Sequence, residues 1–141
     1  MAQSFPFKLV TPAGVAFEAE VESVTAVGPL GEFGVLADHI NFITSLSPGI
    51  LTIRLDANHF RHYVVPGGLA EVKDGVLTML ASEAQPSETL ERSETANEVA
   101  AAEERLKHLS FFQMEYADAE RALALARARL LAAELNHSAH R

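Results

Sequence analysis

The chain of 141 residues contains no cysteine, which excludes disulfide bonds, thiolate zinc sites, iron–sulfur clusters and cysteine nucleophiles. It also lacks long hydrophobic runs, because none approaches the roughly 20 apolar residues that cross a bilayer as a helix. The first residues carry neither a basic stretch nor an apolar stretch, so we expect no secretion signal. We therefore expect a protein of a reducing cytoplasm with no direct membrane insertion.

Basic residues are scarce as well, since nineteen acids against eleven bases give a net charge of −8. Nucleic-acid binding and docking on anionic lipid both draw on clustered Lys and Arg. The composition therefore predicts no nucleic-acid partner. The charge is uneven, however: residues 116–141 carry four bases and three acids, which gives this segment alone a net positive charge.

Motifs that would indicate catalysis are missing too. The segment Gly28–Gly34 reads GxxGxxG, not the GxGxxG of a dinucleotide loop, and no lysine follows a glycine as a Walker A sequence requires. His59 and His62 lie three residues apart in a strand-like segment, where their side chains point to opposite faces, so we expect solvated histidines and no metal pair. We predict no catalytic residue, no cofactor and no metal.

Short strands are predicted from Phe5 to about Ala84. Residues 15–22 alternate apolar and polar, with Val15, Phe17, Ala19 and Val21 on one face. Val24 breaks this alternation, which indicates a bulge or a strand that changes sheets. Residues 50–55 and 60–65 flank a four-residue loop, and residues 69–73 and 76–81 flank Asp74-Gly75, so each pair predicts a hairpin. Many short strands favour an antiparallel sandwich or barrel.

After Pro86 the pattern becomes helical, because residues 87–141 contain no Gly or Pro and are rich in Ala, Leu, Glu and Arg. Ser87 and Ser93 are the candidate caps of a first helix. Apolar stripes at helical spacing predict this helix and a second of about 20 residues. Segment 108–113 breaks the spacing and predicts the turn of a helical hairpin. The two stripes comprise Thr95 or Ala96, Val99, Ala102, Leu106 and Leu109, then Tyr116, Ala119, Leu123, Ala126, Leu130 and Ala133.

The fold class predicted from these patterns is α+β, with an N-terminal antiparallel β-sandwich in residues 1–86 and a C-terminal antiparallel α-helical hairpin in residues 87–141. Alanines along the stripes bury little area, so they favour a weakly docked hairpin that opens or changes partners. A permanently packed hairpin is the alternative. These patterns alone indicate an interaction module.

Two stretches carry a family resemblance. Segment 31–39, Gly-Glu-Phe-Gly-Val-Leu-Ala-Asp-His, followed by Leu-Ser-Pro-Gly at 46–49, resembles a motif of the epsilon subunit of bacterial F-type ATP synthases. Segment 67–72, Gly-Gly-Leu-Ala-Glu-Val, followed by residues 76–81, resembles that family's second motif. Their order and spacing, together with the Ala-rich helical end, extend the resemblance over nearly the whole chain.

The resemblance implies a ten-stranded sandwich and two helices on the central stalk of a proton-translocating ATP synthase. It implies a non-catalytic rotor subunit at the cytoplasmic face of the bacterial inner membrane, whose sandwich contacts the gamma subunit and the c-ring. Glu32, placed at the tip of the 31–34 turn, matches the family position that faces the c-ring. His39 matches a position near gamma, with loop capping as the alternative.

The resemblance also implies that the hairpin of many relatives extends to the catalytic head, where it inhibits ATP hydrolysis by meeting an acidic segment of the beta subunit. Arg121, Arg127 and Arg129 supply the positive charge for such a contact with the beta subunit, and the resemblance also implies the alpha subunit of the catalytic head as a partner. A solvated helix face is the alternative for these arginines. A free-standing protein-binding adaptor and a small hydrolase are the competing interpretations of the whole chain.

The family's ATP-sensing motif, Ile/Leu-Asp-x-x-Arg-Ala, is altered here to Leu-Glu-Arg-Ser-Glu-Thr at residues 90–95. Glu91 keeps the charge of the aspartate, but Glu94 stands where the arginine belongs. A carboxylate in place of a phosphate-facing cation repels ATP. We therefore predict that nucleotide sensing is absent or very weak. In the loop before His39, Ala37 also replaces the family's common proline.

Overall fold

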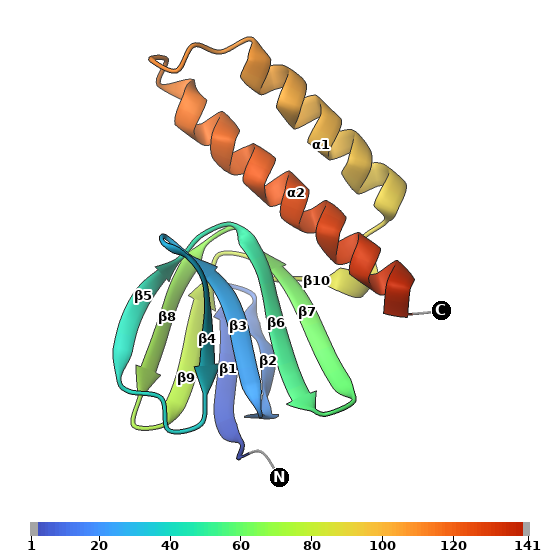
Figure 1. Cartoon of the computed structure of the whole chain (residues 1–141). Coiled ribbons are helices and arrows are strands. Elements are labelled where there is room, and N and C mark those ends of the chain that lie inside the picture. Colours follow the sequence, from blue (N-terminus) through green and yellow to red (C-terminus); the bar gives the residue numbers. More distant parts are fainter. Residues whose placement is uncertain (1–2, 140–141) are drawn as a thin grey trace.

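The computed structural model describes residues 3–139, with side chains described through residue 136. Ten strands form a sandwich of two sheets, and two helices follow as a hairpin against one side of it (Figure 1). This confirms the predicted α+β fold class and the order of its two parts.

The two sheets contain five strands each. Sheet A has the order β2 (Gly14–Val21), β1 (Phe5–Thr11), β9 (Val76–Ala81), β8 (Gly68–Lys73) and β5 (Phe42–Leu46). Sheet B has the order β10 (Gln85–Pro86), β7 (His59–Val65), β6 (Gly49–Asp56), β3 (Ser23–Gly28) and β4 (Gly31–Leu36). Neighbouring strands are antiparallel except β1 and β9, which pair in parallel. That pair joins the first and the second-last strand of the sandwich, and it is the one parallel pair among the described strands of a sandwich that is otherwise antiparallel, as predicted.

The break in alternation at Val24 marks a strand that changes sheets. β2 belongs to sheet A and β3 to sheet B, with only Glu22 between them. A second irregularity was not predicted: the register between β1 and β2 shifts after Leu9, which pairs with Phe17, so that Val10 pairs with Val15. This bulge turns Val15 outward, and the prediction that Val15 shares the buried face with Val21 is wrong.

The predicted hairpins are present. β8 and β9 meet at Asp74 and Gly75, whose φ angles of 50° and 82° are the positive values that a type I′ turn requires. β6 and β7 meet at Ala57 and Asn58, a two-residue turn where the sequence predicted four. The turn is short because the Asp56 carboxylate accepts the Asn58 backbone N–H at 2.8 Å and also contacts the His59 ring. Both contacts hold the pKa of Asp56 below its ordinary value.

The core lies between the two sheets and consists of large apolar side chains. The inward residues of both sheets are almost completely buried, and their largest members are Phe7, Leu9, Leu51, Ile53, Leu77 and Met79. At about 25 cal/mol per Å² of apolar surface, this core is the main stabilising contribution of the sandwich.

A single turn of 3-10 helix (Ser87–Thr89) leads from the sandwich to α1 (Arg92–Lys107) and α2 (Glu115–Ala139). Neither serine caps α1, because the residue before its first turn is Glu91. Ser93 donates to the Glu91 carboxylate at 2.5 Å, and the Thr95 hydroxyl donates to the carbonyls of Glu91 and Arg92. The turn between the helices falls within 108–114, close to the prediction, and α2 has 25 residues where about 20 were expected.

α2 lies between α1 and sheet B and therefore needs two apolar faces (Figure 1). The predicted stripe of α2 is confirmed as one of them, with Ala119, Leu123, Ala126 and Ala133 buried. The sequence did not predict the other face, on which Ala128 and Ala132 pack with Leu125 against Val64 and Ile50 of sheet B. Within the described residues, neither helix is long and apolar enough to span a bilayer.

Candidate protein interaction sites

The sheet A surface that faces away from the core carries a line of apolar side chains. Val10 pairs with Val15 on one side and Leu80 on the other, and Leu80 pairs with Leu69. We call these four residues the apolar row. Half of the surface of Leu69, Leu80 and Val15 is accessible, at 50%, 49% and 53%. An apolar line across four strands is a feature of protein interfaces.

Sequence reasoning missed the apolar row. The alternation within β8 and β9 contained a signal, since Leu69 and Leu80 occupy the polar positions of their strands. Val10 and Val15 join them because of the bulge, which only the strand register reveals.

Glu32 lies within β4 opposite Val27, not at the tip of a turn. The tip is formed by Pro29 and Leu30, and the Leu30 side chain is fully exposed. The predicted loop at residues 28–34 is thus mostly strand. Glu32 faces outward from sheet B and lines a hollow of about 460 Å³ between this sheet and α2. Arg127 lines the same hollow, so the structure brings together two residues that the sequence assigned to different partners.

His39 stabilises the loop between β4 and β5. Its backbone N–H donates to the Leu36 carbonyl at 3.3 Å, and its Nδ1 donates to the Ile40 carbonyl at 2.8 Å. The ring packs on Phe42 with centroids 4.8 Å apart. These contacts support the loop role considered for His39. The residue also lines a second hollow, of about 540 Å³, along the edge formed by β4 and β5.

The three arginines of α2 have different surroundings. The side chains of Arg121 and Arg127 are 73% and 62% exposed, whereas that of Arg129 is only 25% exposed. Arg121 lies 3.8 Å from Asp118 on its own helix, and Arg127 lies 3.8 Å from Glu103 on α1. The alternative of a solvated helix face therefore does not hold for Arg129, which the second apolar face of α2 turns toward the sandwich.

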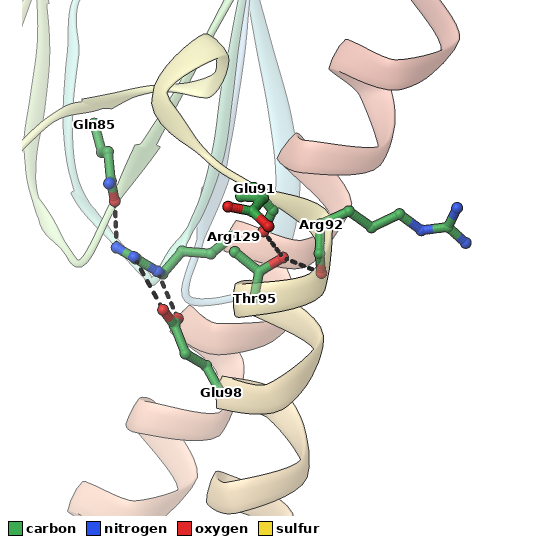
Figure 2. A network of polar contacts seen from close by, with 6 residues as sticks. All are labelled: Gln85, Glu91, Arg92, Thr95, Glu98 and Arg129. Atoms are coloured by element: carbon green, nitrogen blue, oxygen red, sulfur yellow. Dashed lines mark hydrogen bonds and ion pairs between the residues drawn. The ribbon is translucent and has the colours of Figure 1, made fainter.

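Arg129 is bound by two side chains from other elements (Figure 2). Its Nε donates to one oxygen of Glu98 at 2.8 Å and its Nη2 to the other at 3.3 Å. Its Nη1 donates to the Gln85 side chain on β10. We call Gln85, Glu98 and Arg129 the Arg129 cluster. It connects α2, α1 and the sandwich at one point.

A second polar contact lies further along α2. The Asn136 amide donates to the Ser87 carbonyl, and the Ser87 hydroxyl donates to the Asn136 side-chain oxygen at 2.9 Å. Ser87 is almost completely buried, so each of its polar groups needs such a partner. The end of α2 is thereby bound to the segment that leaves the sandwich.

The segment that replaces the ATP-sensing motif lies at the start of α1. Glu91, Arg92 and Glu94 are exposed, and Figure 2 shows the Arg92 side chain pointing away from the Arg129 cluster. Thr95, where the family motif has alanine, is buried and uses its hydroxyl on the Glu91 and Arg92 carbonyls. The absence of nucleotide sensing stays a prediction.

The two histidines of the β6–β7 hairpin, His59 and His62, have different surroundings. His59 is exposed and contacts Asp56, as a solvated turn residue does. His62 is half-buried on the outer face of sheet B, where its Nδ1 lies 3.2 Å from the Thr52 hydroxyl, so its prediction as solvated is wrong. Burial lowers the pKa of His62, and the nearby Glu88 carboxylate opposes this effect. Among the described residues, no group of side chains is placed to hold a metal ion.

Known proteins resemble this chain along most of its length. Residues 4–87 match the family described as "ATP synthase, Delta/Epsilon chain, beta-sandwich domain". The ATP synthase epsilon chain of Afipia carboxidovorans is 42% identical over 105 residues, which cover 74% of this chain and 76% of the relative. That of Bradyrhizobium sp. ORS 278 is 40% identical over 103 residues, covering 73% and 76%.

Solved structures agree with the sequence matches. A chain in the mitochondrial ATP synthase of Euglena gracilis, in rotational state 1, has a TM-score of 0.81 at 26% identity, covering 96% of this chain and 83% of that one. A chain in the central stalk and c-ring of the Tetrahymena thermophila mitochondrial ATP synthase shares the fold, with a TM-score of 0.60 at 18% identity and coverages of 93% and 97%.

These matches define the class of protein as a subunit of a rotary ATP synthase. Within that class, the chain belongs to the ATP synthase epsilon family.

Proposed function

We propose that this chain is a non-catalytic rotor subunit that couples rotation of the c-ring to ATP synthesis in the catalytic head. In this proposal the sandwich (residues 1–86) binds the gamma subunit and the c-ring, and the hairpin (residues 87–141) regulates ATP hydrolysis. The chain would act as a peripheral protein at the cytoplasmic face of the membrane. The family assignment and the absence of a recognisable catalytic motif support this proposal.

The apolar row is the observation that carries the proposal. α2 covers the outer face of sheet B, whereas the outer face of sheet A leaves its apolar row accessible. A subunit that passes torque needs a permanent contact with the shaft, and permanent interfaces are apolar at their centre. We assign the apolar row to gamma, with His39 near the same partner.

The β3–β4 hairpin is the proposed contact with the c-ring. It ends in the exposed Leu30, and Glu32 adds a charge two residues beyond this tip. A protruding apolar tip next to a carboxylate suits a small contact with the loops of a neighbouring protein.

The helical hairpin would inhibit hydrolysis by extending toward the head, where Arg121, Arg127 and Arg129 would meet an acidic segment of the beta subunit. Small residues at its contact with sheet B support this proposal, because Ala128 and Ala132 bury little area per turn. Deletion of residues 87–141 from the assembled complex should then raise ATP hydrolysis. Unchanged hydrolysis would leave coupling as the chain's only role.

The gamma contact is tested by placing a charge in the apolar row. Leu80→Glu should reduce recovery of gamma with this chain by about tenfold or more, because an unpaired charge at the centre of an interface costs several kcal/mol. Phe60→Glu on β7 is the matched control, since Phe60 and Leu80 are both 49% exposed. Equal recovery of gamma with both variants would contradict the assignment of the row. A free-standing adaptor would purify without gamma in any form.

A further inference from the structure

The Arg129 cluster joins α1, α2 and the sandwich, whose other contacts include the small residues Ala128 and Ala132 and the hydrogen bonds between Ser87 and Asn136. Glu98 binds the guanidinium through both of its oxygens, and paired charge-assisted hydrogen bonds are stronger and more directional than a single ion pair. Gln85 adds a neutral acceptor from the sandwich. The guanidinium is mostly shielded from water, so screening weakens this contact less than it weakens an exposed pair.

A second acid of α1, Glu103, also contacts an arginine of α2. Glu103 lies five positions after Glu98 and approaches Arg127, two positions before Arg129, as the antiparallel packing of the helices requires. Among the residues that the structure describes, Arg121 is paired only with Asp118 of its own helix. Carboxylates of α1 therefore occupy two guanidinium groups of α2, and the third arginine does not depend on α1.

We infer that α1 carries an internal latch, in which Glu98 holds Arg129 against Gln85 and keeps the hairpin closed on the sandwich without any bound ligand. Release of the latch detaches Arg129 from Gln85 of the sandwich, and extension of the helices then frees Arg127 from Glu103 as well. In the closed hairpin these two cations are occupied by acids of the same chain. Their later use on an acidic partner rests on the function proposed above.

The closed state is measurable in the full-length chain by itself. Because the chain has no cysteine, Glu20→Cys on β2 and Ala117→Cys on α2 provide two unique, exposed positions for spin labels. The distance between them reports whether the hairpin lies on the sandwich. We expect one narrow distribution for the otherwise unchanged chain.

Arg129→Gln and Glu98→Gln should each broaden this distribution toward longer distances and speed amide exchange in α1 and α2 by about tenfold or more, the loss expected for charge-assisted hydrogen bonds. The double variant should be no more open than either single one, because both remove the same contact. Arg121→Gln, the matched control, should leave both measurements unchanged. A closed hairpin in Arg129→Gln, or additive effects in the double variant, would overturn the latch.

Slow amide exchange in β1 and β9 shows that the sandwich remains folded in each variant, so an open hairpin is distinguishable from unfolding. A separate assay concerns the complex: Glu98→Gln should increase inhibition of ATP hydrolysis if the freed arginines reach the head. An opened hairpin without increased inhibition would keep the latch and refute the proposed inhibitory contact.

Discussion

The sandwich and the hairpin bury their residues in different ways. Between the sheets, Phe7, Leu51 and Leu77 are large and almost completely buried. Between α2 and sheet B, the buried helix residues are Ala128 and Ala132, and polar contacts surround them. Apolar area stabilises the first region, whereas directional contacts of modest strength position the second. This difference in the size of the buried side chains is what the proposed function requires of a rigid sandwich and a detachable helical hairpin.

The strongest test of this comparison removes a large side chain from each region. Leu51→Ala should lower the free energy of unfolding by about 3 kcal/mol, because the packed sheets cannot close the cavity. Leu123→Ala, in the contact between the helices, should cost less, because a hairpin of small residues can shift to fill the space. Denaturant unfolding of both variants measures the difference. Equal losses would contradict the contrast between the regions.

A glycine substitution tests the close approach of β8 to β9 in the sandwich. Gly68 has a φ of 149°, and a Cβ there would meet the Leu80 carbonyl oxygen at 2.0 Å. Gly68→Ala should therefore destabilise the fold by about 2–3 kcal/mol through strain and overlap. Gly14→Ala is the matched control, since its φ is 128° but nothing lies within 4 Å of the added atom. It should show the smaller cost of strain alone, and a cost equal to that of Gly68→Ala would remove the overlap from the explanation.

A larger side chain in the contact between α2 and sheet B should detach the helical hairpin from the sandwich. Ala132→Leu adds a branched side chain at a fully buried position against sheet B, and overpacking of this kind costs about 1–3 kcal/mol. The expected result is faster amide exchange in α2 with an unchanged sandwich. Ala124→Leu, at an exposed position one turn before Ala128 on the same helix, should have no such effect. Loss of the whole fold in Ala132→Leu would show that the two regions are not independent.

The free energy of unfolding should depend weakly on pH through His62, which lies on β7 near the segment that leads to the helices. Because burial lowers the pKa of His62 from its ordinary 6.5, the unfolded chain binds the proton more tightly than the folded one. This contribution to stability is complete above pH 6.5 and is lost as the pH falls through the lowered pKa. His62→Gln should flatten the unfolding profile in that range. Parallel profiles for the variant and the original chain would refute the role of His62.

The smallest effect is expected at Arg121. Its pair with Asp118 is exposed on both sides, and such pairs contribute about 0–1 kcal/mol. Arg121→Gln should change the unfolding midpoint by less than the error of most measurements. A clear loss of stability would indicate an additional contact of this residue.

Sequence reasoning succeeded where local patterns determine structure. The Asp74-Gly75 sequence correctly predicted a two-residue turn. The apolar stripe of α2 was also predicted correctly from Ala119 to Ala133. It failed where a distant segment decides the outcome. Val15 faces outward because of the register with β1, and Arg129 is shielded because Glu98 and Gln85 come from other elements.

The candidate sites follow the same division. The motifs around Glu32 and His39 were visible in the sequence, but Glu32 proved to lie in a strand facing α2. The apolar row was not predicted, because its four residues come from four strands and become neighbours only through the hydrogen-bonded pairing of those strands.

The sequence by itself determined the types of element, their order and the division near Pro86, because turn residues and apolar spacing act over a few positions. Only the tertiary structure decided which outer face α2 covers, which face stays accessible and which acid binds Arg129. Those outcomes depend on side chains that lie far apart in the chain and meet when the two sheets and the two helices pack.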